Sequence, residues 1–265
     1  MRQIQEITSL QNPKVKRVVK LRKRRERDQQ GLYVIDELRE ITRAMAARQP
    51  LEEVYICPEL GADAKLLDLP DDVAGFQCPR AVFEKMAYRE NPDGYLAIAR
   101  QSPLHLKSLI SSDSPLYLVA TAIEKPANLG ALLRTADGVG ADAVLICDPV
   151  ADLYNPNVLR TSTGAVFSMP TVVVESGEAI QWLKEQGVQI VCTTPDTETL
   201  YHEAMYNQPT AVVMGSEAEG LAEVWFAASD RNVRIPMKGI ADSLNVSVSA
   251  ALVLYEALRQ RSAEI

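Results

Sequence analysis

From about residue 115 onward, short uninterrupted runs of apolar residues alternate with segments of helical spacing, and this alternation restricts the possible folds most strongly. The runs LYLVATAI, ADAVLICD, VQIVCTT and PTAVVMG have the length of strands. Within them, runs such as LYLVA and VVM lack the apolar–polar alternation of half-exposed strands, which is typical of strands that are covered on both faces. The segments between them, such as ANLGALLRTADGVG and GEAIQWLKEQG, have helical spacing. The sequence therefore predicts an α/β fold with a mainly parallel sheet and helices on both faces over residues 116–265.

The front of the chain predicts a second, smaller α/β domain over residues 1–100. We expect a basic helix over 12–30, an amphipathic helix over 37–48 and a further helix in AVFEKMAYR. Strands are expected in GLYVID, LEEVYICP and GYLAIAR. The segment QSPLHLKSLISSDSP is rich in Pro and Ser, so residues 101–115 are predicted to be a linker.

Composition excludes several classes of protein. The 265 residues are 47% hydrophobic and 24% charged, which fits one large or two smaller globular domains. No apolar run approaches the roughly 18–20 residues that a membrane span requires, and MRQIQEITSLQNPKVKR lacks the apolar region of a secretory signal. The four cysteines are far apart without a CxxC pair, so we expect no disulfide, no metal site and a cytoplasmic location.

Positive charge is concentrated near the N-terminus. The stretch KVKRVVKLRKRRER, from Lys14 to Arg27, holds nine of the 28 Lys and Arg residues and one Glu. It carries +8, whereas the rest of the chain carries −15, which gives the net charge of −7. The phosphate backbone of a nucleic acid would contact this basic segment, whatever the net charge of the whole chain. The segment therefore indicates an RNA-binding surface. The alternative is a solvated helix face.

Two features do not support other chemistries. GVGADA, residues 138–143, fits the dinucleotide fingerprint formally, but it closes a helix and opens a strand, so we interpret it as a helix-ending turn. The two histidines, His105 and His202, lie in no recognisable nucleophile motif and are expected to be ordinary surface or loop residues.

Three segments carry the candidate chemistry. Asn128 stands after a strand at the start of a helix, where it could cap that helix, and Arg134 follows six residues later. VVMGSEAEGL places Gly215 and Glu217 at the carboxyl end of a buried strand, where open α/β sheets bind ligands and where a glycine lets backbone approach them closely. The stretch RIPMKGIADSLNVSVSAALVLYEAL leads into the last helix through Asn245. Each segment alone is typical of local caps and turns.

In this order, NLGALLRTADGVGA, VVMGSEAEGL and IPMKGIADSLNVSVSAALVLYE resemble the SpoU/TrmH family of RNA ribose 2′-O-methyltransferases, within the SPOUT superfamily. The likeness covers residues 116–262 and includes VLRTSTGAVFSMP as an intermediate segment. ITSLQNPKVKRVVKL, GLYVIDELREI and NPDGYLAIA resemble the family's small L30e-like substrate domain. The chain departs from that domain at Asp36-Glu37, where the family usually has Glu-Gly.

The resemblance implies a deep trefoil knot at the C-terminal end and a homodimer formed through the knotted domain. It implies S-adenosylmethionine as cofactor, without a metal, held by Thr194, Gly215, Ile235, Met237 and Leu244. On this placement, Gly215→Val is expected to block the cofactor while the protein stays folded. The catalytic candidates are Arg134, Asn128, Asn245 and Glu217. The candidate RNA contacts are Lys14, Lys16, Arg17, Lys20, Arg22, Arg24, Arg25 and Arg39.

The sequence thus predicts an enzyme that methylates a ribose 2′-OH of structured RNA, most simply 23S ribosomal RNA. Arg134 is expected to stabilise the developing 2′-alkoxide and to grip a neighbouring phosphate, since a guanidinium is a poor base. Asn128 would orient Arg134 or the RNA, Asn245 would hold its loop or face the second subunit, and Glu217 is expected to accept backbone hydrogen bonds. Two alternatives stay open: methylation of tRNA, and a non-catalytic RNA-binding function of the same fold. A nucleotide-dependent oxidoreductase is not favoured, because its only fingerprint, GVGADA, closes a helix and does not open one.

Overall fold

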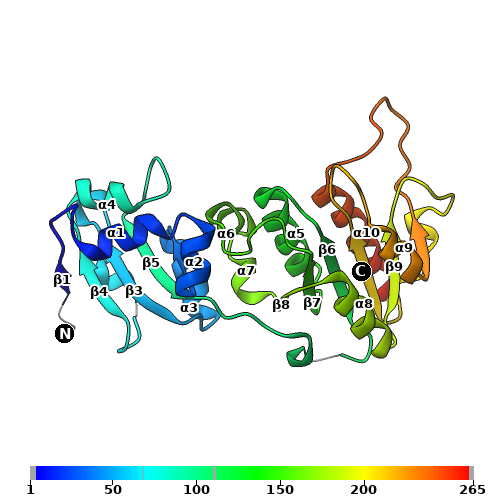
Figure 1. Cartoon of the computed structure of the whole chain (residues 1–265), viewed down its shortest axis with the longest axis horizontal. Coiled ribbons are helices and arrows are strands. Elements are labelled where there is room, and N and C mark those ends of the chain that lie inside the picture. The colour runs from blue at the N-terminus through cyan, green and yellow to red at the C-terminus, as the bar shows by residue number, and fades with distance from the viewer. Residues whose placement is uncertain (1–3, 68, 110–111, 263–265) are drawn as a thin grey trace. The chain divides into compact units, whose positions relative to one another are not determined.

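The computed structural model of the chain describes residues 4–67, 69–109 and 112–262. These residues form two compact units (Figure 1). The first unit comprises the chain up to Ser102 together with Tyr154–Arg160, and the second comprises Pro103–Leu153 and the chain from Thr161 onward. Within the described ranges, no helix is both long and apolar enough to cross a membrane.

The first unit is built on a five-stranded mixed sheet in the order β1-β4-β3-β5-β2. Strand β4 is parallel to β1 and β3, whereas β5 is antiparallel to β3 and β2. The strands are β1 (Gln5–Glu6), β2 (Leu32–Ile35), β3 (Leu51–Ile56), β4 (Ala74–Gln77) and β5 (Tyr95–Arg100). The helices are α1 (Pro13–Lys20), α2 (Arg24–Gln30), α3 (Leu38–Ala46) and α4 (Arg80–Met86), with 3-10 turns η1 (Pro58–Leu60) and η2 (Ala64–Leu66). The sequence did not predict β1 or β4.

The single basic helix predicted over residues 12–30 is wrong, because the structure has two helices there. Helix α1 ends at Lys20 and α2 begins at Arg24, with buried Leu21 in the bend between them. The buried guanidinium of Arg27 donates hydrogen bonds to the carbonyl oxygens of Leu21 and Arg22, each at 2.8 Å. These bonds satisfy carbonyl groups that a continuous helix would have used internally.

The second unit contains a six-stranded sheet in the order β11-β9-β10-β6-β7-β8, and all five pairings are parallel. The strands are β6 (Leu116–Thr121), β7 (Ala143–Cys147), β8 (Thr171–Val174), β9 (Gln189–Thr193), β10 (Thr210–Met214) and β11 (Arg231–Val233). The helices are α5 (Pro126–Gly138), α7 (Ala165–Ser168), α8 (Ser176–Glu185), α9 (Glu223–Ala228) and α10 (Val246–Arg261), with η3 (Leu106–Ser108) and η4 (Tyr201–Glu203). Helix α6 (Pro156–Ser162) begins in the segment that belongs to the first unit.

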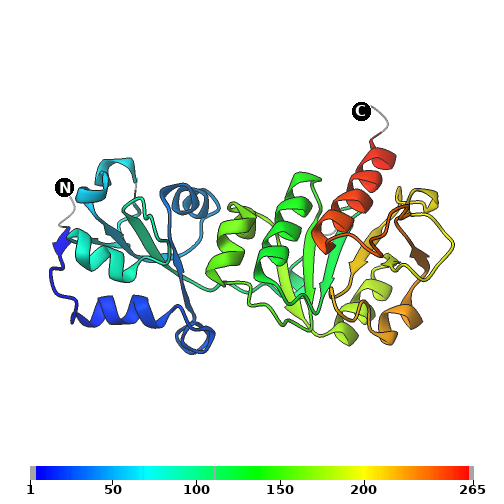
Figure 2. The ribbon, with the colours of Figure 1, turned by 90° about the horizontal axis from the view of Figure 1, so that it is seen from above.

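Helices cover both faces of the parallel sheet, which confirms the predicted α/β class. Figures 1 and 2 show α5, α7 and α10 on one side of the sheet and α8 and α9 on the other. Tyr117 and Val119 of β6 belong to one apolar cluster with Leu183 of α8 and Trp225 of α9. Every residue of β6 is buried, so its other face is covered as well. This double coverage explains why the apolar runs do not alternate. The trefoil knot implied by the family resemblance stays a prediction.

Candidate active site

A cleft of about 600 Å³ opens at the carboxyl ends of the central strands of the second unit. Residues at the ends of β9, β10 and β11 line it, together with the segment that leads into α10. This is the edge at which open parallel sheets bind ligands, and the volume is typical of small-molecule sites. All five predicted cofactor residues lie in its lining, namely Thr194, Gly215, Ile235, Met237 and Leu244.

The cleft combines apolar walls with carboxylates. Phe226, Val233 and Ile235 line it alongside the acidic residues Asp196, Glu217, Glu219 and Asp242. A ligand with a flat apolar part and positive charge suits such a lining, because the side chains can exclude water from one part and attract the other. The first unit has a smaller hollow of about 210 Å³, and the described residues that line it, such as Val54 and Phe76, have no polar side chain.

Gly215 lies where the neighbouring backbone leaves no room for a side chain. A Cβ atom at this position would lie 2.4 Å from the carbonyl carbon and oxygen of Gly220 and 2.7 Å from the amide nitrogen of Leu221. The turn between them is closed by two backbone hydrogen bonds joining Ser216 and Gly220, of 3.0 and 3.1 Å. The expectation that Gly215→Val would leave the fold unchanged is therefore wrong, because the introduced side chain collides with backbone that cannot move aside independently. The glycine serves the closure of this turn.

Asn245 begins α10 and joins this helix to α5. Its Oδ1 accepts hydrogen bonds from the backbone nitrogen of Ser247 at 3.0 Å and from the Ser247 hydroxyl at 2.6 Å, which makes it the N-cap. Its Nδ2 donates to Oδ1 of Asn128 at 3.2 Å. The polar entry SLNVS into the last helix therefore caps α10 and links it to the first turn of α5.

Asn128 is not the cap of its own helix. The helix starts earlier than predicted, at Pro126 with Lys125 as N-cap, because proline fits the first helical position. Asn128 is the third helical residue, and its Nδ2 is buried and has no hydrogen-bond partner within the described ranges. The amide is thus fixed at its oxygen by Asn245, and both N–H donors of its Nδ2 are unused.

Arg134 lies further along α5 with an exposed side chain. Six residues at about 100° each place it about 120° around the helix from Asn128. It is not among the residues that line the cleft, and neither is Asn128, whereas Asn245 and Glu217 are. Within residues 4–67, 69–109 and 112–262, no hydrogen bond or ion pair is found for the Arg134 side chain, so its guanidinium is free to bind an anion.

Glu217 forms an ion pair with Lys125, with 3.5 Å between its Oε2 and the Lys125 Nζ. Both residues line the cleft, and Lys125 also precedes the first turn of α5. The predicted backbone hydrogen bonds of Glu217 stay a prediction. Sequence reasoning missed Lys125, Asp196 and Asp242. Lys125 and Asp196 closely follow the carboxyl ends of β6 and β9, which could have singled them out.

The basic segment of the first unit divides into cations with structural partners and cations without. Lys14 and Arg17 both pair with Glu53, at 2.5 and 3.0 Å. Burial would raise the pKa of the Glu53 carboxyl, but the Lys14 ammonium and the Tyr55 hydroxyl outweigh it, and the pKa is lowered overall.

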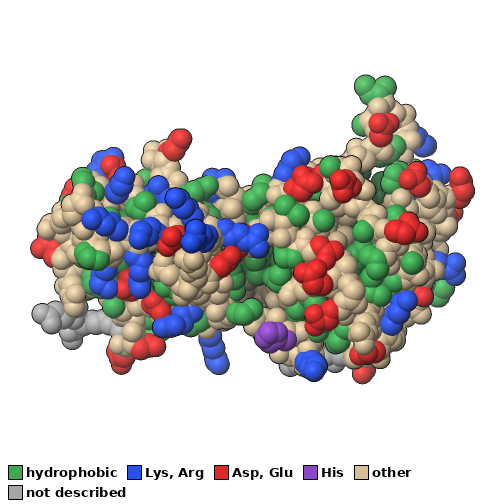
Figure 3. Space-filling view, in the orientation of Figure 1, with side chains coloured by type: hydrophobic (Ala, Val, Ile, Leu, Met, Phe, Trp, Pro, Cys, Tyr) green, Lys and Arg blue, Asp and Glu red, His purple; other side chains and the backbone are tan. Residues whose placement is uncertain are grey.

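Among the other cations of this segment, Arg22 and Arg27 hold backbone carbonyls, and Arg24 pairs with Asp28. The exposed cations without a pairing in the described part of the chain are Lys16, Lys20, Lys23 and Arg25. Figure 3 shows Lys and Arg side chains gathered on this unit.

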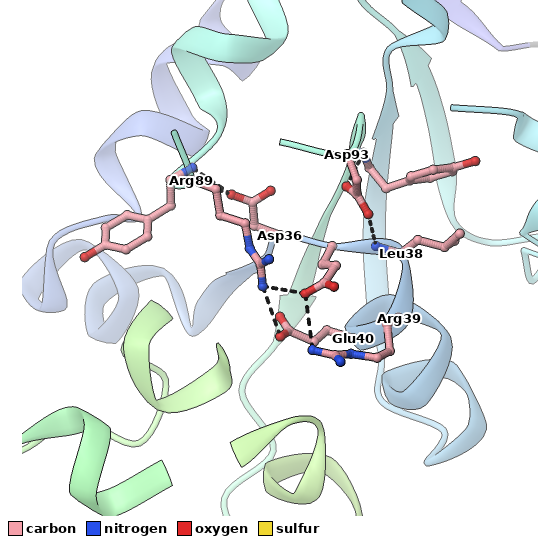
Figure 4. Close-up of polar contacts among 9 residues, drawn as sticks. Asp36, Leu38, Arg39, Glu40, Arg89 and Asp93 are labelled. Atoms are coloured by element: carbon pink, nitrogen blue, oxygen red, sulfur yellow. Dashed lines mark hydrogen bonds and ion pairs between the residues drawn. The ribbon is translucent and has the colours of Figure 1, made fainter. Parts of the chain in front are cut away.

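The last predicted RNA contact, Arg39, belongs to a cluster of charged residues around the start of α3 (Figure 4). Arg39 lies 3.6 Å from Glu37, and Arg89 pairs with both Glu37 and Glu40. Burial raises the pKa of Glu40 to about 7, although Arg89 acts in the opposite direction. Glu37, the residue at which the chain departs from the Glu-Gly pattern, is therefore a partner for two arginines.

The interpretations of GVGADA and of the two histidines agree with the structure. Gly138 ends α5 and Gly140 adopts a positive φ of 67° just before β7, so GVGADA is a helix-ending turn. His105 and His202 are exposed. All four cysteines are buried and free, and the described residues contain no cluster of His, Cys, Asp and Glu that could hold a metal ion.

Comparisons with known proteins agree with this arrangement. A family model described as the SpoU rRNA Methylase family matches residues 115–255, and one described as the MRM3-like substrate binding domain matches residues 12–97. The 23S rRNA (guanosine(2553)-2′-O)-methyltransferase RlmP of Bacillus subtilis (strain 168) is 27% identical over 95% of this chain and 98% of its own length.

Two solved structures are similar over nearly the whole chain. A crystal structure of an RNA 2′-O ribose methyltransferase, 44% identical, has a TM-score of 0.84 and covers 97% of this chain and 99% of its own. The AdoMet-bound rRNA methyltransferase from Sinorhizobium meliloti, 26% identical, has a TM-score of 0.90 and covers 99% of this chain and 100% of its own. The likeness therefore extends over both units.

Proposed function

The chain belongs to the SpoU rRNA methylase family, and from that premise we propose that it transfers a methyl group from S-adenosylmethionine to a ribose 2′-OH of 23S ribosomal RNA. The observation that carries this proposal is the cleft at the carboxyl ends of β9, β10 and β11, which gathers all five residues expected to bind the cofactor. Ribosomal RNA is favoured over tRNA because RlmP, similar over nearly its whole length, is named for methylating 23S rRNA.

The residues of the cleft fit S-adenosylmethionine. Its adenine would lie against apolar walls such as Ile235 and Leu244, and its positive groups would face carboxylates such as Asp196 and Asp242. When bound, the cofactor supplies a methyl group that is already activated by its sulfonium. The protein must then orient the ribose hydroxyl, exclude water and stabilise the oxygen as its proton leaves.

Arg134 is the proposed stabiliser of the developing 2′-oxyanion. A guanidinium stays protonated, so it can hold an oxyanion and a neighbouring phosphate together, while phosphate or water takes the proton. Its free side chain on α5 supports this role. The Asn128–Asn245 hydrogen bond positions the start of α5 against α10, so Asn128 would orient the helix that carries Arg134. The Glu217–Lys125 ion pair would steady the edge of the cleft.

A homodimer through α10 would place Arg134 at a subunit interface. Val248, Leu252 and Tyr255 form an exposed apolar stripe on α10, with exposed fractions of 48%, 37% and 52%. Asn128 is hydrogen-bonded to Asn245. Ten residues further along each chain segment, Gly138 lies next to the Tyr255 hydroxyl. Helices α5 and α10 therefore run parallel. Arg134 therefore lies level with the middle of the stripe, so that pairing of two copies there would bring it beside the second copy.

The first unit is proposed to bind the RNA substrate through the exposed cations of α1, α2 and the bend between them. We retain residues 1–100 as the substrate-binding domain, 101–115 as linker and 116–265 as the methyltransferase domain, which the two matched ranges, 12–97 and 115–255, support. A cytoplasmic location is proposed because ribosomal RNA is the substrate and all four cysteines are free.

The decisive experiment follows labelled methyl transfer. Purified protein is mixed with S-adenosylmethionine and unmodified 23S ribosomal RNA transcribed in vitro, and 2′-O-methylated positions are mapped. We expect one or a few sites to be methylated, and the same sites to lack the mark in cells without the gene. Calorimetry should show binding of S-adenosylmethionine and none of a nicotinamide cofactor. Transfer to tRNA alone would contradict the proposed substrate, and absence of cofactor binding would contradict the activity.

A further inference from the structure

Tyr88 is an exposed aromatic residue directly after α4 in the first unit, with 45% of its surface accessible. We propose that its ring stacks on an unpaired base of the RNA substrate, as the aromatic part of the cationic surface of this unit. This inference rests on the proposed function, because it names a contact with the same substrate. Neither the charge pattern nor the family resemblance singled out this residue.

The backbone at Tyr88 is fixed by a buried carboxylate. Asp36 Oδ2 accepts hydrogen bonds from the backbone nitrogens of Tyr88 at 2.7 Å and of Arg89 at 3.2 Å (Figure 4). Asp36 is only 9% exposed, and burial is the largest influence on its pKa, which is raised. Burying a carboxylate opposes folding unless the group is hydrogen-bonded. The two hydrogen bonds from Tyr88 and Arg89 offset part of this cost, and they hold the backbone at Tyr88 in one conformation.

A second anchor comes from the basic segment. The Arg22 guanidinium donates to the carbonyl oxygens of Lys85 and Ala87, at 3.0 and 2.5 Å, immediately before Tyr88. Arg22 lies in the bend between α1 and α2, so Tyr88 is fixed directly beside the segment that carries the free cations. At the far end of the loop, Asp93 Oδ2 accepts from the backbone nitrogen of Leu38 at 2.8 Å.

The loop presents its aromatic ring outward and keeps its arginine inward. Arg89 is turned back onto Glu37 and Glu40, as Figure 4 shows, so its charge is already paired. The ring of Tyr88 has no such partner for its face among the residues described, although its hydroxyl accepts a long hydrogen bond of 3.4 Å from Asn157 Nδ2. An anchored ring loses little conformational entropy when a flat ligand covers it.

The surroundings favour an RNA base over a protein partner. Lys85 and Lys23 are exposed near the anchored segment, and within the described ranges neither side chain has a hydrogen bond or ion pair. Proteins that bind single-stranded RNA combine such free cations with aromatic rings, because cations hold the backbone and rings stack on unpaired bases. A protein interface would be expected to include more apolar surface than one ring.

The test measures binding to unmodified 23S ribosomal RNA, transcribed in vitro, over a series of potassium chloride concentrations. Tyr88→Ala should lower the affinity by about 5- to 100-fold, the range for loss of one stacked base, without changing the salt slope. Tyr88→Phe should bind within about twofold of wild type, since the ring is kept. Lys85→Ala is the contrasting variant: it should reduce the salt slope by about 0.7–0.9, as loss of one phosphate contact does.

Asn157→Ala removes the hydroxyl contact of Tyr88 and leaves the ring, so it should bind RNA like wild type. The proposal is overturned if Tyr88→Ala binds RNA normally, or if Asn157→Ala or Tyr88→Phe loses as much affinity as Tyr88→Ala. A change in sedimentation of Tyr88→Ala, with RNA affinity intact, would identify a second copy of the chain as the occupant. If wild type itself neither binds nor methylates this RNA, the proposed function fails first.

Discussion

Asn245 has two tasks, and substitutions at Asn245 combined with one at Asn128 separate them. Its Oδ1 caps α10 through Ser247, and its Nδ2 donates to Asn128. Asn245→Ala removes both. Loss of an N-cap costs about 0.5–2 kcal/mol, and loss of one neutral hydrogen bond costs about 0.5–1.5 kcal/mol. We therefore expect the free energy of unfolding to fall by about 2 kcal/mol, which corresponds to about 4–8 °C in melting temperature for a unit of this size.

Asn245→Asp should be nearly neutral, within about 0.5 kcal/mol, because aspartate caps as well as asparagine and its charge favours a helix N-terminus. The amide of Asn128 can turn, so that its unused Nδ2 donates to the introduced carboxylate. Calorimetric melting of both variants, alone and combined with Asn128→Ala, gives the coupling energy between the two positions. Equal losses in the Ala and Asp variants, or a coupling of zero, would refute this division of tasks.

The remaining predictions concern catalysis, assembly, RNA binding and pH. Arg134→Ala should keep cofactor binding but slow single-turnover methyl transfer by about 10²-fold or more, and Arg134→Lys should recover little; a loss within threefold would remove Arg134 from the mechanism. Leu252→Glu should shift sedimentation from dimer to monomer, whereas an unchanged dimer would exclude the stripe as the interface. Glu40 has a pKa raised by burial to about 7, so its contribution favours the folded state at low pH and is lost as pH rises through 7. The unfolding free energy of wild type should accordingly fall relative to that of Glu40→Gln, by about 1–3 kcal/mol between pH 5 and 8, and parallel pH profiles would contradict this. Reversing the charge of the four free cations Lys16, Lys20, Lys23 and Arg25 should weaken RNA binding and reduce the salt slope by at least about 3. Cofactor affinity should not change, and the control variant Lys184→Glu should bind RNA like wild type. An unaltered slope would show that the segment is only a solvated helix face.

The parallel sheet and its cleft could be predicted because their signals are local and strong. Runs such as residues 116–120 are apolar throughout, and the residues that follow the strand ends include the glycine and polar side chains that line the cleft. The break between α1 and α2 could not be predicted in this way. Lysine and arginine favour helix at every position there. The bend is held by Arg27 and also by contacts of Arg22 with residues more than sixty positions away.

The same limit applies to the charges. A count of cations between Lys14 and Arg27 treats all nine alike, but Glu53 lies on a strand far along the sequence and pairs with two of them. The sequence left open that Asn128 caps its helix, because asparagine prefers that position, but its partner in the structure, Asn245, is 117 residues away. Which polar groups are already satisfied depends on the folded chain, and single-sequence patterns do not contain that information.

The closed turn at Gly215 determines where the cleft could be redesigned for a bulkier cofactor analogue. Nothing can be removed from a glycine, and nothing can be added there, because the backbone of Gly220 fills the space a side chain would need. Met237 and Leu244 also line the cleft, on the largely exposed segment that leads into α10. Shortening either of these side chains would widen the cleft without disturbing the sheet, so engineering for altered cofactor specificity should begin at the approach to α10.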